Sequence, residues 1–439
     1  MLSDRFDLPL STASRGAADS YAAALDRLLA ADVGADALLD AALAADPGLA
    51  LAHAARARLL QLQARAADAK AAIATAQGLA AGASARERGH VAALALAVEG
   101  RAAEALAAVR THAAEFPRDA LVLSLALGVY GLIGFSGARD HHERQRALLE
   151  GLAQHWGDHW WFLTWHGWSR VETGDVASGV AMIERGLALN PRNAHGVHAR
   201  AHGHVEAGEA DEGAAFVARF LETYAPDGQL HCHLSWHLAL FALARGDASR
   251  AWAIYDRAIR PGRARSAPMP TLADGASFLW RWSIYGHGGA AADWREVADH
   301  AGRFFARPGL AFADLHAALA EAASGAAEAA DARAAALDAL GAAGRLDAGP
   351  VVALVSRAAC AFAAGAYGEA ATLLEQALAD LPRIGGSHAQ RELVEDTFIV
   401  ACLRAGTGAR AAPLLRARLA RRPSRRDRAW LAAISPGGN

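Results

Sequence analysis

Five histidines in two groups are the residues of this sequence best suited to chemistry. His195, His198 and His202 form one group, and His233 and His237 form the other. At about 100° per helical residue, the first three fall within a sector of about 60°, and the other two lie about 40° apart. Neighbouring helices pack about 8–10 Å apart, so two such helices side by side would turn all five imidazoles toward one surface.

Imidazole acts as a general acid or base near neutral pH and also binds metal ions. The i, i+4 spacing of His198 and His202 would allow both rings to hold one metal ion, but Ala199 stands where an HExxH motif has glutamate. Glu206, one turn beyond His202, could serve as a base or a third ligand. We favour acid–base or hydrogen-bonding roles over a metal, and we expect no cofactor. The alternative is that each histidine is only a packed, hydrogen-bonded polar residue.

A recurring distance between glycine and proline indicates the elements that position these side chains. Glycine precedes proline by 17 positions in four segments: Gly100–Pro117, Gly174–Pro191, Gly365–Pro382 and Gly406–Pro423. Glycine permits a tight turn between two helices, and proline ends the second helix because it cannot continue one. The spacing predicts an all-α solenoid of tetratricopeptide-type antiparallel helix pairs, each about 34 residues long, with roughly ten or eleven pairs.

In the tetratricopeptide register the joining glycine is position 15, and positions 2, 5 and 9 line the inner face. With Gly208 as the joint, these positions are His195, His198 and His202. Three other joints assign further residues to the inner face. One gives His233 and Trp236, with His237 beside them; a second gives Trp161, Thr164 and Trp168; a third gives Glu87 and His90. A tryptophan stripe at helical spacing more often belongs to a core than to a ligand platform.

Two stretches interrupt the repeat pattern. Residues 261–270 hold three prolines and are expected to be a loop or lobe boundary, dividing helical repeats at 1–260 from continuous repeats at 271–439. The most apolar stretch, 120–135, is too short to span a bilayer and is expected to be a buried helix.

Composition narrows the function classes. The 439 residues are 53% hydrophobic, which suits a large core, and carry a formal net charge of −2. We therefore expect neither nucleic acid nor membrane as a partner. Three separated cysteines without a CxxC pair fit a reducing compartment. Since the first residues also lack the apolar core of a signal peptide, we expect a cytoplasmic protein.

Several segments together resemble the tetratricopeptide repeat protein 38 family, in a bacterial form. The segments, which cover nearly the whole chain, are RERGHVAALALAVEG (86–100), FPRDAL (116–121), the histidine run 195–202, HCHLSWHLALFALARGD (231–247), AIYDRAI (253–259), ADGASFLWRW (273–282) and GGSHAQREL (385–393). The resemblance supports the repeat fold and implies little about activity. The resemblance points to a set of residues around one cavity: His90, His198, His202, His233, His237, Asp274, Ser387, Gln390 and Arg391.

These observations lead to three hypotheses. The first is a binding protein whose pocket, lined by His90, Trp161, Trp168, His195, His198, His202, His233, Trp236 and His237, holds a small polar or anionic molecule or a short peptide. The second is an enzyme, a lyase, hydrolase or isomerase, in which His202 or His237 is the acid or base. Asp274 or Glu206 would orient that histidine, and Arg391 would bind a carboxylate. The third is an assembly scaffold with a protein partner.

Overall fold

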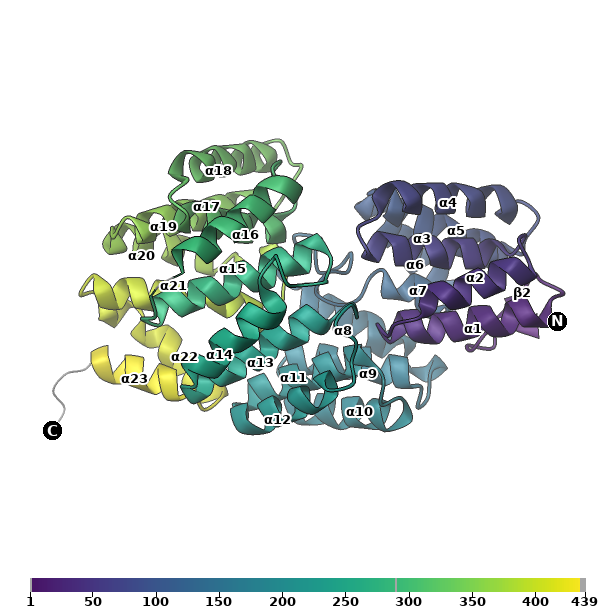
Figure 1. The fold of residues 1–439 in the computed structure, drawn as a ribbon, viewed down its shortest axis with the longest axis horizontal. Coiled ribbons are helices and arrows are strands. Elements are labelled where there is room, and N and C mark those ends of the chain that lie inside the picture. The colour runs from purple at the N-terminus through teal and green to yellow at the C-terminus, as the bar shows by residue number, and fades with distance from the viewer. Residues whose placement is uncertain (1, 289, 435–439) are drawn as a thin grey trace. The chain divides into compact units, whose positions relative to one another are not determined.

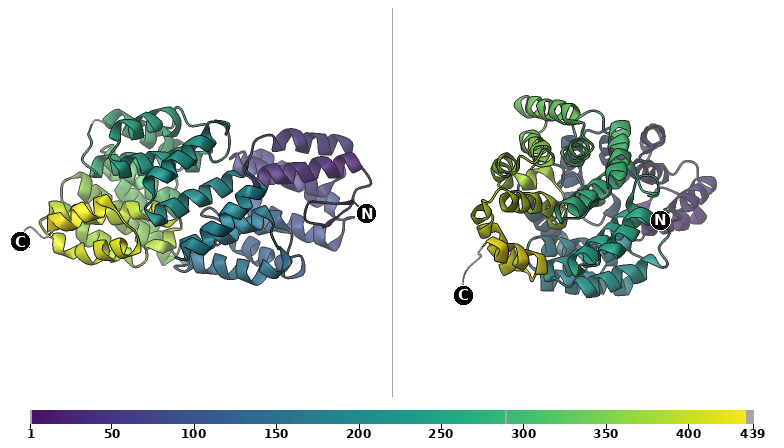
Figure 2. Two further views of the ribbon diagram at one scale, coloured as in Figure 1. Left: turned by 90° about the horizontal axis from the view of Figure 1, so that it is seen from below. Right: turned by 60° about the vertical axis from the view of Figure 1, so that its left-hand side comes forward.

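The regular structure is almost entirely helical. The computed structural model describes residues 2–288 and 290–434, and within them only two short strands occur, β1 (Leu2–Ser3) and β2 (Pro9–Leu10), which pair antiparallel. Successive helices run back and forth as pairs (Figures 1 and 2). The predicted fold class, an all-α solenoid of helix pairs, is confirmed. None of the helices in the described residues combines the length and apolarity that a membrane crossing requires.

The helices follow one another with short connections. Their bounds are α1 (Arg15–Leu29), α2 (Ala35–Ala45), α3 (Ala50–Leu62), α4 (Ala66–Ala80), α5 (Ala85–Val98), α6 (Ala102–Glu115), α7 (Ala120–Ser124), α8 (His141–Leu152), α9 (Trp160–Glu172), α10 (Val176–Leu189), α11 (Ala194–Ala207), α12 (Ala210–Leu221), α13 (His231–Arg245), α14 (Ala248–Ile254), α15 (Pro268–Ile284), α16 (Ala291–Phe304), α17 (Ala311–Ala323), α18 (Ala327–Ala342), α19 (Gly349–Ala363), α20 (Tyr367–Leu378), α21 (His388–Arg404), α22 (Ala412–Arg421) and α23 (Arg425–Ile434). Short 3₁₀ turns occupy Ala153–His155, Leu381–Ile384 and Gly408–Arg410, and a π-helical turn, Tyr255–Ile259, follows α14.

The joining glycines lie where the spacing predicts them. The four found from the glycine–proline spacing, Gly100, Gly174, Gly365 and Gly406, separate successive helices with φ between 70° and 90°, and Gly208 and Gly246 do the same. This left-handed backbone conformation carries a steric cost for residues with a Cβ atom. The glycine–proline spacing therefore located real helix joints.

In the pair α9 and α10, a glycine five positions after the joining Gly174 allows the two helices to approach closely. A Cβ atom on Gly179 of α10 would lie 2.5 Å from the carbonyl oxygen of Gly167 on α9, and one on Gly167 would lie 2.6 Å from the oxygen of Gly179. The backbones of the two helices thus touch directly, which only glycine allows at these positions.

The chain divides into two compact units. Unit 1 comprises the chain up to Ser136, together with His142–Arg200 and Asp227–Leu230, and unit 2 comprises Gly137–His141, Ala201–Pro226 and the chain from His231 on. The division falls within α11, which is one continuous helix. The proline-rich segment 261–270 lies inside unit 2.

Aromatic stacking marks the core of each unit. In unit 1, the ring of Trp156 stacks on Phe162, with centroids 5.2 Å apart and an interplanar angle of 8°. In unit 2, Tyr255 stacks on Phe278, with centroids 4.8 Å apart and the same angle. Both stacks occur between side chains of different helical segments and fix the packing of successive pairs.

Two expectations about interruptions need correction. The predicted loop at 261–270 is shorter, because α15 already begins at Pro268. Proline is tolerated in the first helical turn, where its missing N–H would have no partner. The predicted buried helix at 120–135 stops at Ser124, and turns follow. A Cβ atom on Gly131 would lie 2.3 Å from the oxygen of Leu127, so the chain there takes a fold that requires glycine.

Candidate functional site

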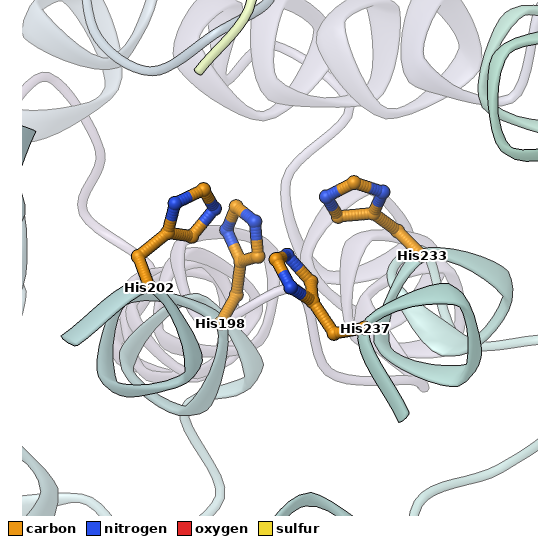
Figure 3. A group of neighbouring side chains, drawn as sticks. All are labelled: His198, His202, His233 and His237. Atoms are coloured by element: carbon orange, nitrogen blue, oxygen red, sulfur yellow. The ribbon is translucent and has the colours of Figure 1, made fainter. Parts of the chain in front are cut away.

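Four histidines on two helices form the candidate site, which we call the histidine cluster: His198 and His202 on α11, and His233 and His237 on α13. One nitrogen of each ring lies within 4.8 Å of those of the other three, and all four residues are buried. The rings project from the two helices toward the same side (Figure 3). The predicted convergence of five histidines is therefore present for four of them, whereas His195 does not belong to this group and its ring contacts Trp165.

Helix geometry explains the arrangement. Each helix contributes a pair at i and i+4, and such pairs lie on one helical face, one turn apart. His202, His233 and His237 belong to unit 2, whereas His198 stands just before the division within α11. Since α11 is a continuous helix, it places His198 one turn from His202.

His237 occupies the middle of the cluster. Its ring meets that of His202 edge to face, with centroids 4.8 Å apart, and that of His233 in the same way at 4.9 Å. His237 is fully buried. Edge-to-face contacts of this kind are favourable between aromatic rings and limit how each ring can turn.

A buried carboxylate sets the orientation of His233. The Nδ1–H group of His233 donates to Oδ1 of Asp274 on α15, at 2.8 Å. An ionised carboxylate can only accept, so this bond places the proton on Nδ1 and leaves the lone pair on Nε2. We expected Asp274 to orient His202 or His237, and this expectation is corrected because the hydrogen bond goes to His233.

Trp236 supports the cluster from within the core. Its ring stacks on His233 at a centroid distance of 5.2 Å and meets His237 edge to face at 4.9 Å. The indole Nε1–H donates to Oγ of Ser277, at 3.1 Å, and the guanidinium of Arg281 lies 5.5 Å from the ring centroid. Trp236 is fully buried and is a packing partner of two histidines; its predicted contact with a ligand stays a prediction.

Two further buried groups near Asp274 were not singled out from the sequence. Burial, and next the Asp274 charge, raise the pKa of the Cys232 thiol well above its usual value, which keeps it protonated. Burial lowers the pKa of His316 on α17 to about 4, although Asp274 opposes this effect. His316 lies nine residues before Gly325, as His237 lies nine residues before Gly246. The register could therefore have found His316.

Glu206 does not belong to the histidine cluster. Its Oε1 lies 3.4 Å from Nδ1 of His388, and its Oε2 lies 3.3 Å from Nε of Arg421. The group of side chains able to share a metal ion does not include it. The expectation that Glu206 serves His202 as a base or third ligand is corrected, because unit 2 supplies cationic partners that no local spacing could reveal.

The GGSHAQREL segment has a structural role at the start of α21. The Ser387 hydroxyl accepts from the backbone N–H of Gln390, at 3.3 Å, and the Gln390 side chain accepts from the backbone N–H of Ser387, at 2.9 Å. These bonds form a capping box, which satisfies amide groups at the beginning of a helix. Arg391 donates to the backbone oxygen of Gly386. Ser387 and Gln390, predicted to bind ligand, cap α21 through these bonds, and Arg391, predicted to bind a carboxylate, holds a backbone carbonyl; their ligand-binding roles stay predictions.

His90 belongs to a separate network in unit 1. Asp119 accepts from Nδ1 of His90 at 2.9 Å, from Nε2 of His112 at 2.9 Å and from Arg86 at 3.1 Å. Burial alone would raise the pKa of Asp119, but the two histidines and Arg86 lower it far below its usual range. His90 is thus part of a buried network that joins α5, α6 and the start of α7, and its predicted ligand contact stays a prediction.

The tryptophans of α9 pack in the core of unit 1. Trp161 lies 5.1 Å from Trp156, and Trp168 packs among Val129, Val171 and Ile183. Trp165 contacts the ring of His195 at 5.0 Å, and burial followed by the charge of Arg58 lowers the pKa of His195 to about 4. The ligand-binding role predicted for Trp161 and Trp168 is corrected to core packing, which the sequence had already favoured.

Comparisons with known proteins add little to this geometry. No family model matches the sequence. Among solved structures, a similar chain comes from the "Structure of Naa15/Naa10 bound to HypK-THB", at 12% identity and a TM-score of 0.22, over 92% of the present chain. The chain spans 63% of the length of that structure's chain. Neither the fold nor the function rests on this likeness. The resemblance to the tetratricopeptide repeat protein 38 family stays a prediction.

Proposed function

We propose that the chain is a tetratricopeptide-type binding protein whose histidine cluster holds a small polar or anionic ligand, or the end of a short peptide. The observation that carries the proposal is the convergence of four buried imidazole nitrogens from α11 and α13 within 4.8 Å. Four imidazoles gathered in this way have no equivalent in an ordinary helix–helix contact, where apolar side chains dominate. Convergent polar groups in buried surroundings are typical of ligand sites.

The chemistry of the cluster favours a ligand with acceptor atoms. A neutral imidazole offers one N–H donor and one acceptor nitrogen, and a protonated one offers two donors. The nearby carboxylate of Asp274 is already bonded to His233. This carboxylate therefore orients the ring of His233, and its charge does not by itself select a cationic ligand. Carboxylate or phosphate oxygens would pair with several ring N–H groups at once.

An enzyme is the second candidate. In this hypothesis the general base would be His233 in place of His202 or His237. The hydrogen bond from His233 to Asp274 is the arrangement that orients a general base, since the carboxylate fixes the tautomer and stabilises the imidazolium. In that case Nε2 of His233 would accept the proton from the substrate. The proposed reaction classes remain those of a small metabolite: hydrolysis, elimination or isomerisation.

Calorimetry with small anions and peptides tests the proposal. We would titrate the untagged chain with inorganic phosphate, citrate and a tripeptide, and repeat the titration with His202→Phe and His237→Phe, which remove the ring nitrogens while keeping a ring of similar size. The control is His155→Phe, a surface histidine. Binding by the native chain and the control, with at least a tenfold loss in both cluster variants, is expected.

Other outcomes decide against the proposal. Equal binding by the native chain and both cluster variants would move the site elsewhere. If no probe binds and both variants lose several degrees of melting temperature, the cluster is a packing feature and the scaffold hypothesis replaces the binding hypothesis. Turnover of a bound probe that is lost in His233→Phe would favour the enzyme.

A further inference from the structure

We infer that the histidine cluster is a binding site for one divalent transition-metal ion, with His198, His202, His233 and His237 as its ligands. This inference deepens the proposed function and rests on it, because it names the first occupant of the same site. The argument depends on the type of the donor atoms, their separation and the group that supports them.

The donor set is the one that intermediate metal ions prefer. Imidazole nitrogen suits Zn²⁺, Cu²⁺, Ni²⁺ and Fe²⁺, whereas Mg²⁺ and Ca²⁺ take oxygen ligands. Two i, i+4 histidine pairs on adjacent helices supply four nitrogens, which equals the coordination number of a closed tetrahedral zinc site. All four residues are buried, so a bound ion would be shielded from bulk water.

The separations are close to those of a filled site. Zinc–nitrogen bonds of about 2.0–2.1 Å place tetrahedral ligand atoms about 3.4 Å apart. The four nitrogens lie within 4.8 Å of one another. The largest separation thus exceeds the spacing of a filled site by at most about 1.4 Å, a difference that small rotations of the rings about their side-chain bonds can supply.

Asp274 provides the support that metal-binding histidines commonly have. Its carboxylate accepts from Nδ1–H of His233 at 2.8 Å, which orients the ring so that Nε2 faces away from Asp274. The four imidazoles are neutral ligands, so a bound divalent ion keeps its charge of +2, and buried Asp274 offsets one unit of it. The positive charge that remains would attract an anionic ligand, which could bind as a fifth ligand if the coordination expands.

Metal analysis and titration of the untagged full-length chain test the inference. The protein, purified without a metal-affinity step, is treated with EDTA, shown by circular dichroism to remain helical, and titrated with Zn²⁺ and with Co²⁺ as a spectroscopic probe. One ion per chain, with the absorption of a tetrahedral nitrogen-bound Co²⁺ and a raised melting temperature, is expected. Mg²⁺ is expected to leave both unchanged.

Variants assign the ligands. His202→Phe and His237→Phe are each expected to weaken Zn²⁺ binding more than 100-fold, and Asp274→Asn about 10–100-fold, as for other outer-shell partners. The matched control is His204→Gln on the same helix, whose Nδ1 faces Glu209 at 2.9 Å, and it is expected to bind as the native chain does. Should the cluster variants fail to fold, the native titration still decides.

The failures of the two proposals differ. A folded native chain that takes up no stoichiometric Zn²⁺ or Co²⁺, or that binds them equally after His202→Phe and His237→Phe, overturns the metal site. If the metal-free chain still binds phosphate, citrate or the peptide, the proposed function stands without the metal. If the ion binds and no such probe does, the metal site stands and the ligand proposal fails.

Discussion

At the scale of single residues, Asp119 is a buried carboxylate of unit 1 that bonds to three basic side chains. It accepts from Arg86, His90 and His112, and all four residues are buried. Asp119→Ala would remove the carboxylate partner of the Arg86 guanidinium, which keeps its bond to the Pro9 oxygen, and the acceptor of two imidazoles. Breaking a buried ion pair in this way costs about 3–5 kcal/mol of unfolding free energy.

Urea unfolding followed by circular dichroism measures this cost. The control is Asp68→Ala, which removes an exposed partner of Arg65 and is expected to change the free energy by less than about 1 kcal/mol. A loss below about 1 kcal/mol for Asp119→Ala would mean that the network adds little net stability.

The site residues also show which features of a site can be predicted from sequence and which cannot. The spacing of His198, His202, His233 and His237 fixed which helical faces they share, because the geometry of a helix is local. The partners of Asp274 and Glu206 could not be obtained in this way, since their hydrogen bonds join segments that are distant in sequence. The resemblance drew attention to Ser387 and Gln390, but a capping box and a ligand site use the same residue types.

At the scale of elements, the contact of α9 with α10 gives a prediction about glycine. Gly179→Ala would raise helix propensity by about 1 kcal/mol, yet its Cβ would lie 2.5 Å from the oxygen of Gly167 and 2.8 Å from Cγ2 of Val171. Separating the helices to make room is expected to outweigh the gain and to destabilise by about 1–3 kcal/mol.

The matched control is Gly78→Ala in α4, where no atom outside the local helix lies within 4 Å of the added Cβ. This variant is expected to gain up to about 1 kcal/mol. Thermal unfolding of both variants would show opposite shifts of the melting temperature. Shifts of the same sign would mean that α9 and α10 can move apart at little cost.

The ends of helices were predictable where glycine and proline restrict the backbone conformation directly. The joints at Gly100, Gly174 and Gly406 follow from their left-handed φ, which few other residues adopt. The stretch 120–135 was not predictable, since its apolar composition suits a helix and only tertiary packing turns the chain after Ser124. Composition likewise gives no sign of the division within α11, because a repeat array has similar neighbours throughout.

At the scale of the whole molecule, acid sensitivity follows from histidines in both units. Burial lowers the pKa of His159 and His195 in unit 1, and of His316 in unit 2, to about 4 in each case. A histidine in the unfolded chain titrates near 6.5. Between pH 4 and 6.5 the unfolded state therefore binds more protons than the folded state, so stability rises with pH in this window.

Above pH 6.5 these histidines are neutral in both states and cost no stability. As the pH falls from 6.5 toward 4, proton uptake by the unfolded chain lowers the free energy of unfolding by about 1–3 kcal/mol for each residue. His316→Phe removes one of these groups and keeps a ring in its place, so the slope of unfolding free energy against pH should become shallower than in the native chain. Urea unfolding at pH 7.5, 6.0, 5.0 and 4.5 measures that slope, and His155→Phe controls for the loss of a surface histidine. An unchanged slope in His316→Phe would show that the buried imidazole of His316 takes up its proton in the folded chain as easily as in the unfolded one.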